Sequence, residues 1–144
     1  MSIEFVTGDL FNAKTQAIVN TVNCVGVMGK GVALEFKKRW PDNFKVYKKK
    51  CDHGQIKIGE MFVFSNNSSL FESDVGFEHL INFPTKKHWR SKSKVEYIIE
   101  GLEDFIFEVR RLNIKSVAIP PLGCGNGGLP WSQIRPLIVD KISE

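Results

Sequence analysis

Hydrophobic and polar positions alternate along the chain in blocks that suit strands and helices in turn. Short apolar runs predict five strands, at residues 3–7, 17–22, 61–64, 79–83 and 116–119. The run at 17–22 is largely apolar, which is typical of a strand covered on both faces. Pro84 predicts the end of the fourth strand, so residues 85–90 are expected to form a loop.

Apolar residues spaced three and four apart predict helices between these strands. The pattern is strongest over residues 94–112. A helix over 30–39 is expected to end at Trp40, because a proline follows, and Asp42 is expected to cap the next helix. A last helix starts at residues 129–131. Strands alternating with helices imply one α/β domain with a mostly parallel sheet.

Two glycine-rich turns follow predicted strands and lead into helices. Residues 26–31 read Gly-Val-Met-Gly-Lys-Gly, and residues 123–128 read Gly-Cys-Gly-Asn-Gly-Gly. Such turns bring backbone N–H groups close to an anion, although glycines also serve ordinary tight turns. The carboxyl ends of parallel strands meet at one edge of a sheet, so two such turns suit a diphosphate. Neither turn matches the dinucleotide fingerprint or the P-loop, and the chain has no G-x-S-x-G nucleophile elbow.

The distribution of charge along the chain indicates which class of partner it could bind. The formal net charge is +4, and basic residues gather at 30–50 and 86–94. A basic surface attracts phosphate-rich partners, above all nucleic acid. A solvated helix face is the commoner explanation of any single basic run.

Other features restrict the compartment and the cofactors. The chain has no apolar run long enough for a membrane span and no signal-peptide pattern at its N-terminus, so we expect a cytoplasmic protein without a membrane partner. Cys24, Cys51 and Cys124 are expected to be free thiols. Cys51 and His53 lack a second ligand pair at a zinc-site interval, and neither a metal nor another cofactor is expected.

Four stretches carry a family signature. They read Thr-Gly-Asp-Leu-Phe from residue 7, Asn-Thr-Val-Asn-Cys-Val-Gly-Val-Met-Gly-Lys-Gly from 20, Asn-Phe-Pro-Thr-Lys-Lys-His-Trp from 82 and Leu-Gly-Cys-Gly-Asn-Gly-Gly-Leu from 122. The chain thereby resembles macrodomains, and among them the DarG type of the DarTG toxin–antitoxin system and its relative, the terminal ADP-ribose protein glycohydrolase. This resemblance implies a three-layer α/β/α fold around a mixed, mostly parallel sheet.

The resemblance also implies an ADP-ribose site. Asp9 would accept a hydrogen bond from adenine, Asn20 and Asn23 would face ribose hydroxyls, and the two glycine turns would enclose the diphosphate. The implied binding residues are Gly8, Asp9, Leu10, Asn20, Asn23, Val27, Met28, Gly29, Lys30, Gly31, Val32, Ala33, Thr85, Pro121, Leu122, Gly123, Cys124, Gly125, Asn126, Gly127 and Gly128.

The family's catalytic lysine corresponds to Lys86. A neutral amine near the anomeric carbon can attack it or accept a proton. Burial and the nearby charges of Lys87, Arg90 and His88 would lower the pKa of Lys86 towards that form. A plain phosphate contact is the competing role for Lys86, and Lys87 is its positional rival. Lys87, His88 and Arg90 are assigned to DNA binding.

The chain departs from its relatives in the second glycine turn. The protein-directed relative has an aspartate where this chain has Gly127, so Asn23 or the substrate itself must assist Lys86. We also expect the chain to be a macrodomain cut from a longer antitoxin, whose toxin-binding C-terminal region is absent here.

Three functions follow from the resemblance. The first is a hydrolase that removes ADP-ribose from thymidine in single-stranded DNA and so reverses the action of a DarT-type toxin. The second is an ADP-ribose-binding module without catalysis. The third is an ADP-ribose 1″-phosphate phosphatase. The basic runs favour a DNA substrate, and Lys86 favours catalysis.

Overall fold

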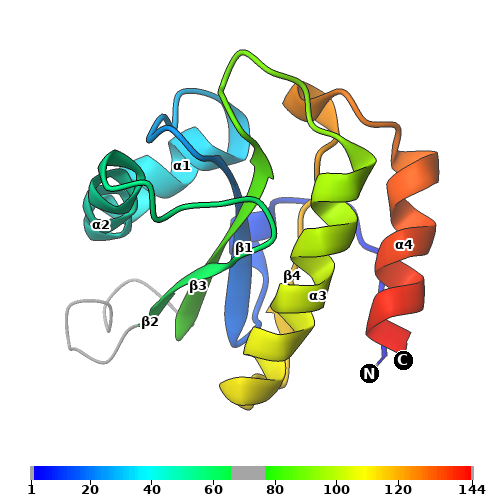
Figure 1. The fold of residues 1–144 in the computed structure, drawn as a ribbon. Helices are drawn as coiled ribbons and strands as arrows, with labels where there is room; N and C mark the ends of the chain where they lie inside the picture. The colour runs from blue at the N-terminus through cyan, green and yellow to red at the C-terminus, as the bar shows by residue number, and fades with distance from the viewer. Residues whose placement is uncertain (1, 66–76, 144) are drawn as a thin grey trace.

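Over residues 2–65 and 77–143, the parts of the chain that the computed structural model describes, a mixed four-stranded sheet separates two pairs of helices (Figure 1). The strands are β1 (Ala17–Asn23), β2 (Phe62–Ser65), β3 (His79–Lys86) and β4 (Val117–Ala118), and the helices are α1 (Gly31–Arg39), α2 (Pro41–Asp52), α3 (Val95–Arg111) and α4 (Trp131–Ser143). The described residues also form the short 3-10 helices η1 (Leu10–Asn12) and η3 (Gly125–Gly127). The expected three-layer α/β/α fold is confirmed.

The sheet is organised around β1. The strand order is β2-β3-β1-β4, with β1 parallel to both β3 and β4, and β2 antiparallel to β3. Strand β1 buries six of its seven residues, as expected for a strand that has neighbours on both sides and helices on both faces. The carboxyl ends of β1, β3 and β4 therefore lie at the same edge of the sheet.

Two apolar clusters attach the helix layers to the sheet. The cluster beneath α3 and α4 includes Val19, Ile81, Phe83, Ile98, Leu102, Phe105 and Ile134. The cluster beneath α1 and α2 includes Ile18, Val22, Leu80, Phe36, Trp40 and Tyr47. Neighbouring residues such as Ile18 and Val19 enter opposite clusters because successive side chains of a strand point to opposite faces.

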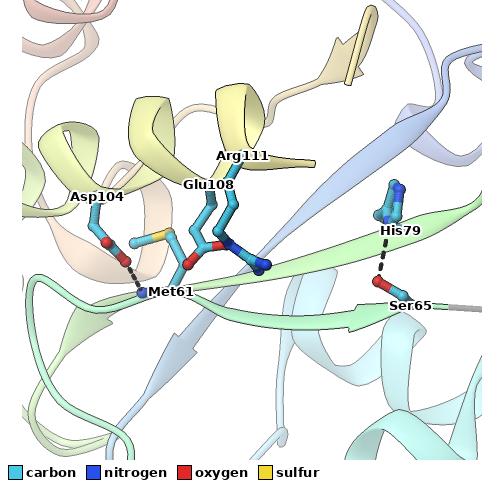
Figure 2. Close-up of polar contacts among 6 residues, drawn as sticks. All are labelled: Met61, Ser65, His79, Asp104, Glu108 and Arg111. Atoms are coloured by element: carbon cyan, nitrogen blue, oxygen red, sulfur yellow. Dashed lines mark hydrogen bonds and ion pairs between the residues drawn. The ribbon is translucent and has the colours of Figure 1, made fainter. Parts of the chain in front are cut away.

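Polar contacts fix the edge strand β2 (Figure 2). The backbone N–H of Met61 donates to Oδ2 of Asp104 in α3 over 2.6 Å, and Oγ of Ser65 shares a hydrogen bond of 2.7 Å with Nδ1 of His79 in β3. These contacts connect the two ends of β2 to the rest of the domain.

The structure corrects the prediction of a strand at residues 3–7, because this segment forms no strand. The ring of Phe5 instead lies 6.3 Å from that of Trp131 and beneath the guanidinium of Arg135, both in α4. This segment therefore packs against a helix. The alternation of apolar and polar residues alone does not reveal whether the packing partner is a helix or another strand.

Two element boundaries also differ from those expected. Strand β3 continues through Pro84 to Lys86, so residues 85 and 86 are not part of a loop. This is possible because β2 pairs with β3 only up to Asn82, and beyond it the proline has no β2 partner that needs an N–H group. Helix α2 starts at Pro41, with Asp42 in its first turn rather than at its cap, because proline suits the first helical position.

Close contact between α3 and the sheet predicts the effect of Gly101→Ala. A Cβ on Gly101 would lie 2.3 Å from Cε1 of the buried Phe83 ring. Overpacking of this kind costs about 1–3 kcal/mol or more, which exceeds the gain of about 1 kcal/mol in helix propensity. We expect a lower urea midpoint for Gly101→Ala. In the control, Phe83→Leu combined with Gly101→Ala should lose less than the sum of the two single changes, and a raised midpoint for Gly101→Ala alone would contradict the argument.

Candidate functional site

Two glycine loops meet at the carboxyl edge of the sheet. The first glycine loop (residues 24–30) joins β1 to α1, and the second glycine loop (residues 121–130) joins β4 to α4. A Cβ on Gly31, directly after the first loop, would lie 3.4 Å from Nδ2 of Asn126 in the second. The predicted juxtaposition of the two glycine turns is therefore present, with the segment after β3 at the same end of the sheet (Figure 1).

Asn23, the last residue of β1, folds the first glycine loop around its side chain. Its Oδ1 accepts hydrogen bonds from the backbone N–H groups of Val25 (3.1 Å) and Val27 (3.3 Å), and its Nδ2 donates to the carbonyl of Val27 over 2.8 Å. The hydroxyl of Tyr47 in α2 lies 2.7 Å from the backbone oxygen of Asn23 and 2.9 Å from its Oδ1. Asn23 therefore sets the shape of the loop in this structure.

The sequence pattern does not mark Tyr47 as a residue of the site. The residue is fully buried, and burial raises the pKa of its hydroxyl above the ordinary value, so the hydroxyl stays protonated and can donate. A tyrosine at an apolar helical position carries no local mark of such a role. Only the fold brings it to Asn23.

Asn20 lies beneath the site and is completely buried. Its Nδ2 donates to Oδ1 of Asn82 over 3.2 Å, and Asn82 in turn exchanges hydrogen bonds with Asn43 of α2. Met28, 1% exposed, lies against the same amide. In this structure Asn20 supports the floor of the site, and the ribose contact assigned to it stays a prediction.

Lys86 ends β3 next to Asn23, its partner in the β1 register. Its Nζ lies 3.5 Å from the backbone oxygen of Trp89, to which it donates. Burial, and secondly the positive charge of Lys30 in the first glycine loop, hold the pKa of Lys86 below its usual range. The expected contribution of burial is therefore confirmed, whereas the positive charge comes from Lys30 and not from Lys87, Arg90 or His88 as expected from the sequence.

Ser93 links the strand end of Lys86 to the second glycine loop. Its hydroxyl donates to the carbonyl of Thr85, and its backbone N–H donates to the carbonyl of Gly127 over 2.9 Å. A Cβ on Gly127 would lie 3.1 Å from Cβ of Ser93, so the close approach of Ser93 favours glycine where the protein-directed relative has aspartate. Nothing next to Ser93 in the sequence marks it as a residue of the site.

Asp9 precedes η1 and caps it. Its Oδ1 accepts a hydrogen bond of 2.9 Å from the N–H of Phe11, and its side chain is otherwise exposed. The ring of Phe11 lies 5.2 Å from that of Phe36 in α1, which attaches this segment to the helix that follows the first glycine loop. The structural role of Asp9 is present, and its adenine contact stays a prediction.

The residues assigned to the site differ in exposure. The exposed ones are Gly8, Asp9, Val27, Gly29, Lys30, Gly31, Pro121, Gly125, Asn126 and Gly128. The partly exposed ones are Leu10, Val32, Ala33, Lys86 and Cys124. The buried ones are Asn20, Asn23, Met28, Thr85, Leu122, Gly123 and Gly127. The glycines, Asn126, Lys30 and Lys86 are thus accessible to a ligand that binds over the loops.

The three cysteines are free, as expected. Burial raises the pKa of Cys24 to about 11 and also raises the pKa of Cys51 and Cys124, so these thiols are poor nucleophiles at neutral pH. Lysine is therefore the candidate nucleophile or base at this edge of the sheet.

Within the described residues, no helix has the length and apolar character needed to cross a bilayer.

The fold and the site define an α/β/α domain with paired glycine loops of the kind that suits a phosphorylated ligand. The Macro domain family model matches residues 19–138, and the chain therefore belongs to the macro domain family.

Several DNA ADP-ribosyl glycohydrolases are similar in sequence to nearly the whole of this chain. It is 53% identical over 142 residues to the DNA ADP-ribosyl glycohydrolase of Mycobacterium tuberculosis and 48% identical over 140 residues to that of Thermus aquaticus, covering 99% and 97% of this chain. A DNA ADP-ribosyl transferase-DNA ADP-ribosyl glycohydrolase fusion protein of Thermosipho africanus is 35% identical. The chain spans 39%, 38% and 39% of the lengths of these three relatives.

Solved structures confirm the family. The macrodomain of Mycobacterium tuberculosis DarG superposes with a TM-score of 0.91 at 52% identity, covering 96% of this chain and 88% of that one. Thermosipho africanus DarTG in complex with ADP-ribose gives a TM-score of 0.86 at 36% identity, covering 94% of this chain and 37% of that one. The resemblance to DarG macrodomains is thereby confirmed.

The Tyr47 hydroxyl predicts the effect of Tyr47→Phe. This change preserves the buried ring but leaves the backbone oxygen of Asn23 without its donor, which costs about 1–3 kcal/mol. We expect a lower free energy of unfolding in urea and weaker ADP-ribose binding in calorimetry, because the first glycine loop loses support. Tyr97→Phe, at a partly exposed tyrosine of α3, is the matched control and should change neither quantity appreciably. Equal effects of the two changes would count against this role of Tyr47.

Proposed function

We propose that this macro domain is a hydrolase that removes ADP-ribose from thymidine bases of single-stranded DNA. The observation that carries the proposal is the position of Lys86, a partly buried amine with a lowered pKa beside two facing glycine loops. The names of the relatives at 53% and 48% identity support the reaction, and the basic run at 86–94 supports a DNA substrate.

In the proposed complex the two glycine loops hold the diphosphate. Backbone N–H groups of Gly29 to Gly31 and of the second glycine loop would donate to its oxygens, and the start of α1 adds the positive end of its dipole. Asp9 would face the adenine amine. Asn23 would hold the first glycine loop in shape beneath the distal ribose, so that its assistance to Lys86 is one of position.

The proposed reaction breaks the N-glycosidic bond between the distal ribose and the base. Neutral Lys86 either attacks the anomeric carbon or accepts a proton from the attacking water. The electron pair of the broken bond goes to the base nitrogen, which also takes up a proton. In the first case a bond between Nζ and the anomeric carbon forms, and water then hydrolyses it. Both routes need the uncharged amine.

The partner and location follow from the same proposal. A DarT-type toxin would be the source of the modified DNA, as the name of the Thermosipho africanus fusion protein supports, and contact with it would lie mainly in a C-terminal region outside this sequence. The chain would be one domain of a longer antitoxin. Free thiols agree with the proposed cytoplasmic location.

Loss of the amine tests the catalytic role. We expect Lys86→Ala to release ADP-ribose from thymidine-modified single-stranded DNA at least about 100-fold more slowly than wild type, as for removal of a nucleophile or general base. ADP-ribose binding, measured by calorimetry, should remain because the glycine loops are intact. Lys87→Ala, which removes the neighbouring lysine assigned to DNA binding, should raise KM for the DNA but leave kcat near the wild-type value.

Each contrary result has a distinct meaning. A wild-type protein that binds ADP-ribose and releases none from DNA would be a binding module. Release of phosphate from ADP-ribose 1″-phosphate without release from DNA would instead identify a phosphatase. Slow release by Lys87→Ala with normal release by Lys86→Ala would move the catalytic role by one residue.

The charge of Lys30 predicts a shift in the pH profile. A neighbouring positive charge disfavours protonated Lys86, so removing it in Lys30→Gln raises the pKa of Lys86. Because the neutral amine is the active form, kcat should rise with pH through this pKa, and the rising limb should move to higher pH in Lys30→Gln. Lys38→Gln, an exposed change in α1, should leave the limb in place. An unchanged or lowered limb in Lys30→Gln would refute the coupling.

A further inference from the structure

Three planar side chains follow one another on the exposed segment after β3. The imidazole of His88 stacks on the indole of Trp89, with ring centroids 5.4 Å apart and an interplanar angle of 30°. The guanidinium carbon of Arg90 lies 4.6 Å from the centroid of the same indole. Trp89 nevertheless remains 44% exposed, although large aromatic side chains are usually buried. We call residues 88–90 the stacking segment.

Two backbone and side-chain contacts give the stacking segment a fixed shape. The N–H of Arg90 donates to Nδ1 of His88 over 3.1 Å, which closes a tight turn around Trp89. The N–H of Ser91 donates to the carbonyl of His88 over 3.0 Å. An exposed indole held in a closed turn can receive a ligand without first being ordered.

The surroundings of the stacking segment are basic. Nζ of Lys87 and Nζ of Lys94 each lie 5.8 Å from the ring centroid of Tyr97, so cations and a second aromatic ring continue along the surface into α3. Among the ion pairs of the described residues, none involves Lys87, Arg90 or Lys94. These cations are available to an external anion, and cations interleaved with aromatic rings suit a single-stranded nucleic acid.

The stacking segment also contacts the candidate catalytic lysine. The carbonyl that accepts the hydrogen bond from Nζ of Lys86 is that of Trp89 itself, at 3.5 Å. The stacking segment is therefore adjacent to Lys86, and a base stacked on this indole would belong to a nucleotide near the modified one.

We propose that Trp89, flanked by His88 and Arg90, is a stacking platform for the base next to the modified thymidine, an inference that rests on the proposed function of the site. Stacking requires no particular base, because every base has a π-face, so the platform selects a single strand rather than a sequence. Bases of a duplex already stack on one another and would not reach it. The platform is a positioning site and takes no part in breaking the glycosidic bond.

The test compares two substrates that differ only in the neighbouring bases. One is a thymidine-modified single-stranded oligonucleotide, and the other is ADP-ribosylated thymidine as a single nucleoside. For Trp89→Ala we expect KM on the oligonucleotide to rise about 5- to 150-fold, the loss of one stacked base, with kcat nearly unchanged. KM on the single nucleoside should stay at the wild-type value. Trp89→Phe, which keeps a π-face, should recover most of the loss.

Phe107→Ala is the matched control for removing an exposed aromatic side chain. Phe107 is 59% exposed and lies twelve residues along α3 from its first residue, about 18 Å from the site end of the helix. It should behave as wild type on both substrates. Equal losses for Trp89→Ala on both substrates, or none on the oligonucleotide, would overturn the platform.

Binding of unmodified oligothymidine, measured by fluorescence anisotropy, separates this inference from the proposed function. If wild type released no ADP-ribose, the proposed function would fail, and weaker oligothymidine binding by Trp89→Ala would still support the platform. If release proceeded normally and Trp89→Ala bound oligothymidine as wild type does, the platform alone would fail.

Discussion

The structure depends on how the chain leaves the central strand. Strand β1 is buried between two neighbouring strands and two helix layers, and its last residue, Asn23, must satisfy polar groups where the ladder ends. It does so through hydrogen bonds to the backbone of the first glycine loop, while the Tyr47 hydroxyl of α2 donates a hydrogen bond to Asn23. The loop therefore has its shape before any ligand arrives, which reduces the ordering cost of binding.

Local patterns predicted those elements whose burial the chain itself reveals. The run of β1 and the helical spacing of α3 were correctly identified, because continuous burial and a single apolar face leave clear periodicities. The segment at 3–7 was misassigned because its partner is α4, which is far away in the sequence. Likewise, the end of β3 depends on where β2 stops, and Pro84 alone does not reveal that.

The same distinction holds for the site. Two glycine turns after parallel strands predicted the facing loops, because sheet topology brings strand ends together. Ser93 and Tyr47 were missed, since their hydrogen bonds to Gly127 and to Asn23 join residues more than twenty positions apart in the sequence. Asn20 has a structural role that its motif does not indicate, because it joins a buried asparagine network that holds β1, β3 and α2 together. Its ribose contact stays a prediction.

Electrostatics imposes opposing demands on the proposed reaction. Cations near Lys86 attract phosphate and keep its amine neutral, but each bound phosphate favours the protonated amine and works against that effect. Backbone N–H groups resolve the conflict in part, because they stabilise a diphosphate without a titratable charge of their own. Lys30 lies in the first glycine loop, and its positive charge lowers the pKa of Lys86. In the proposed complex Lys87 and Arg90 would hold the DNA strand, while burial and Lys30 keep the pKa of Lys86 low.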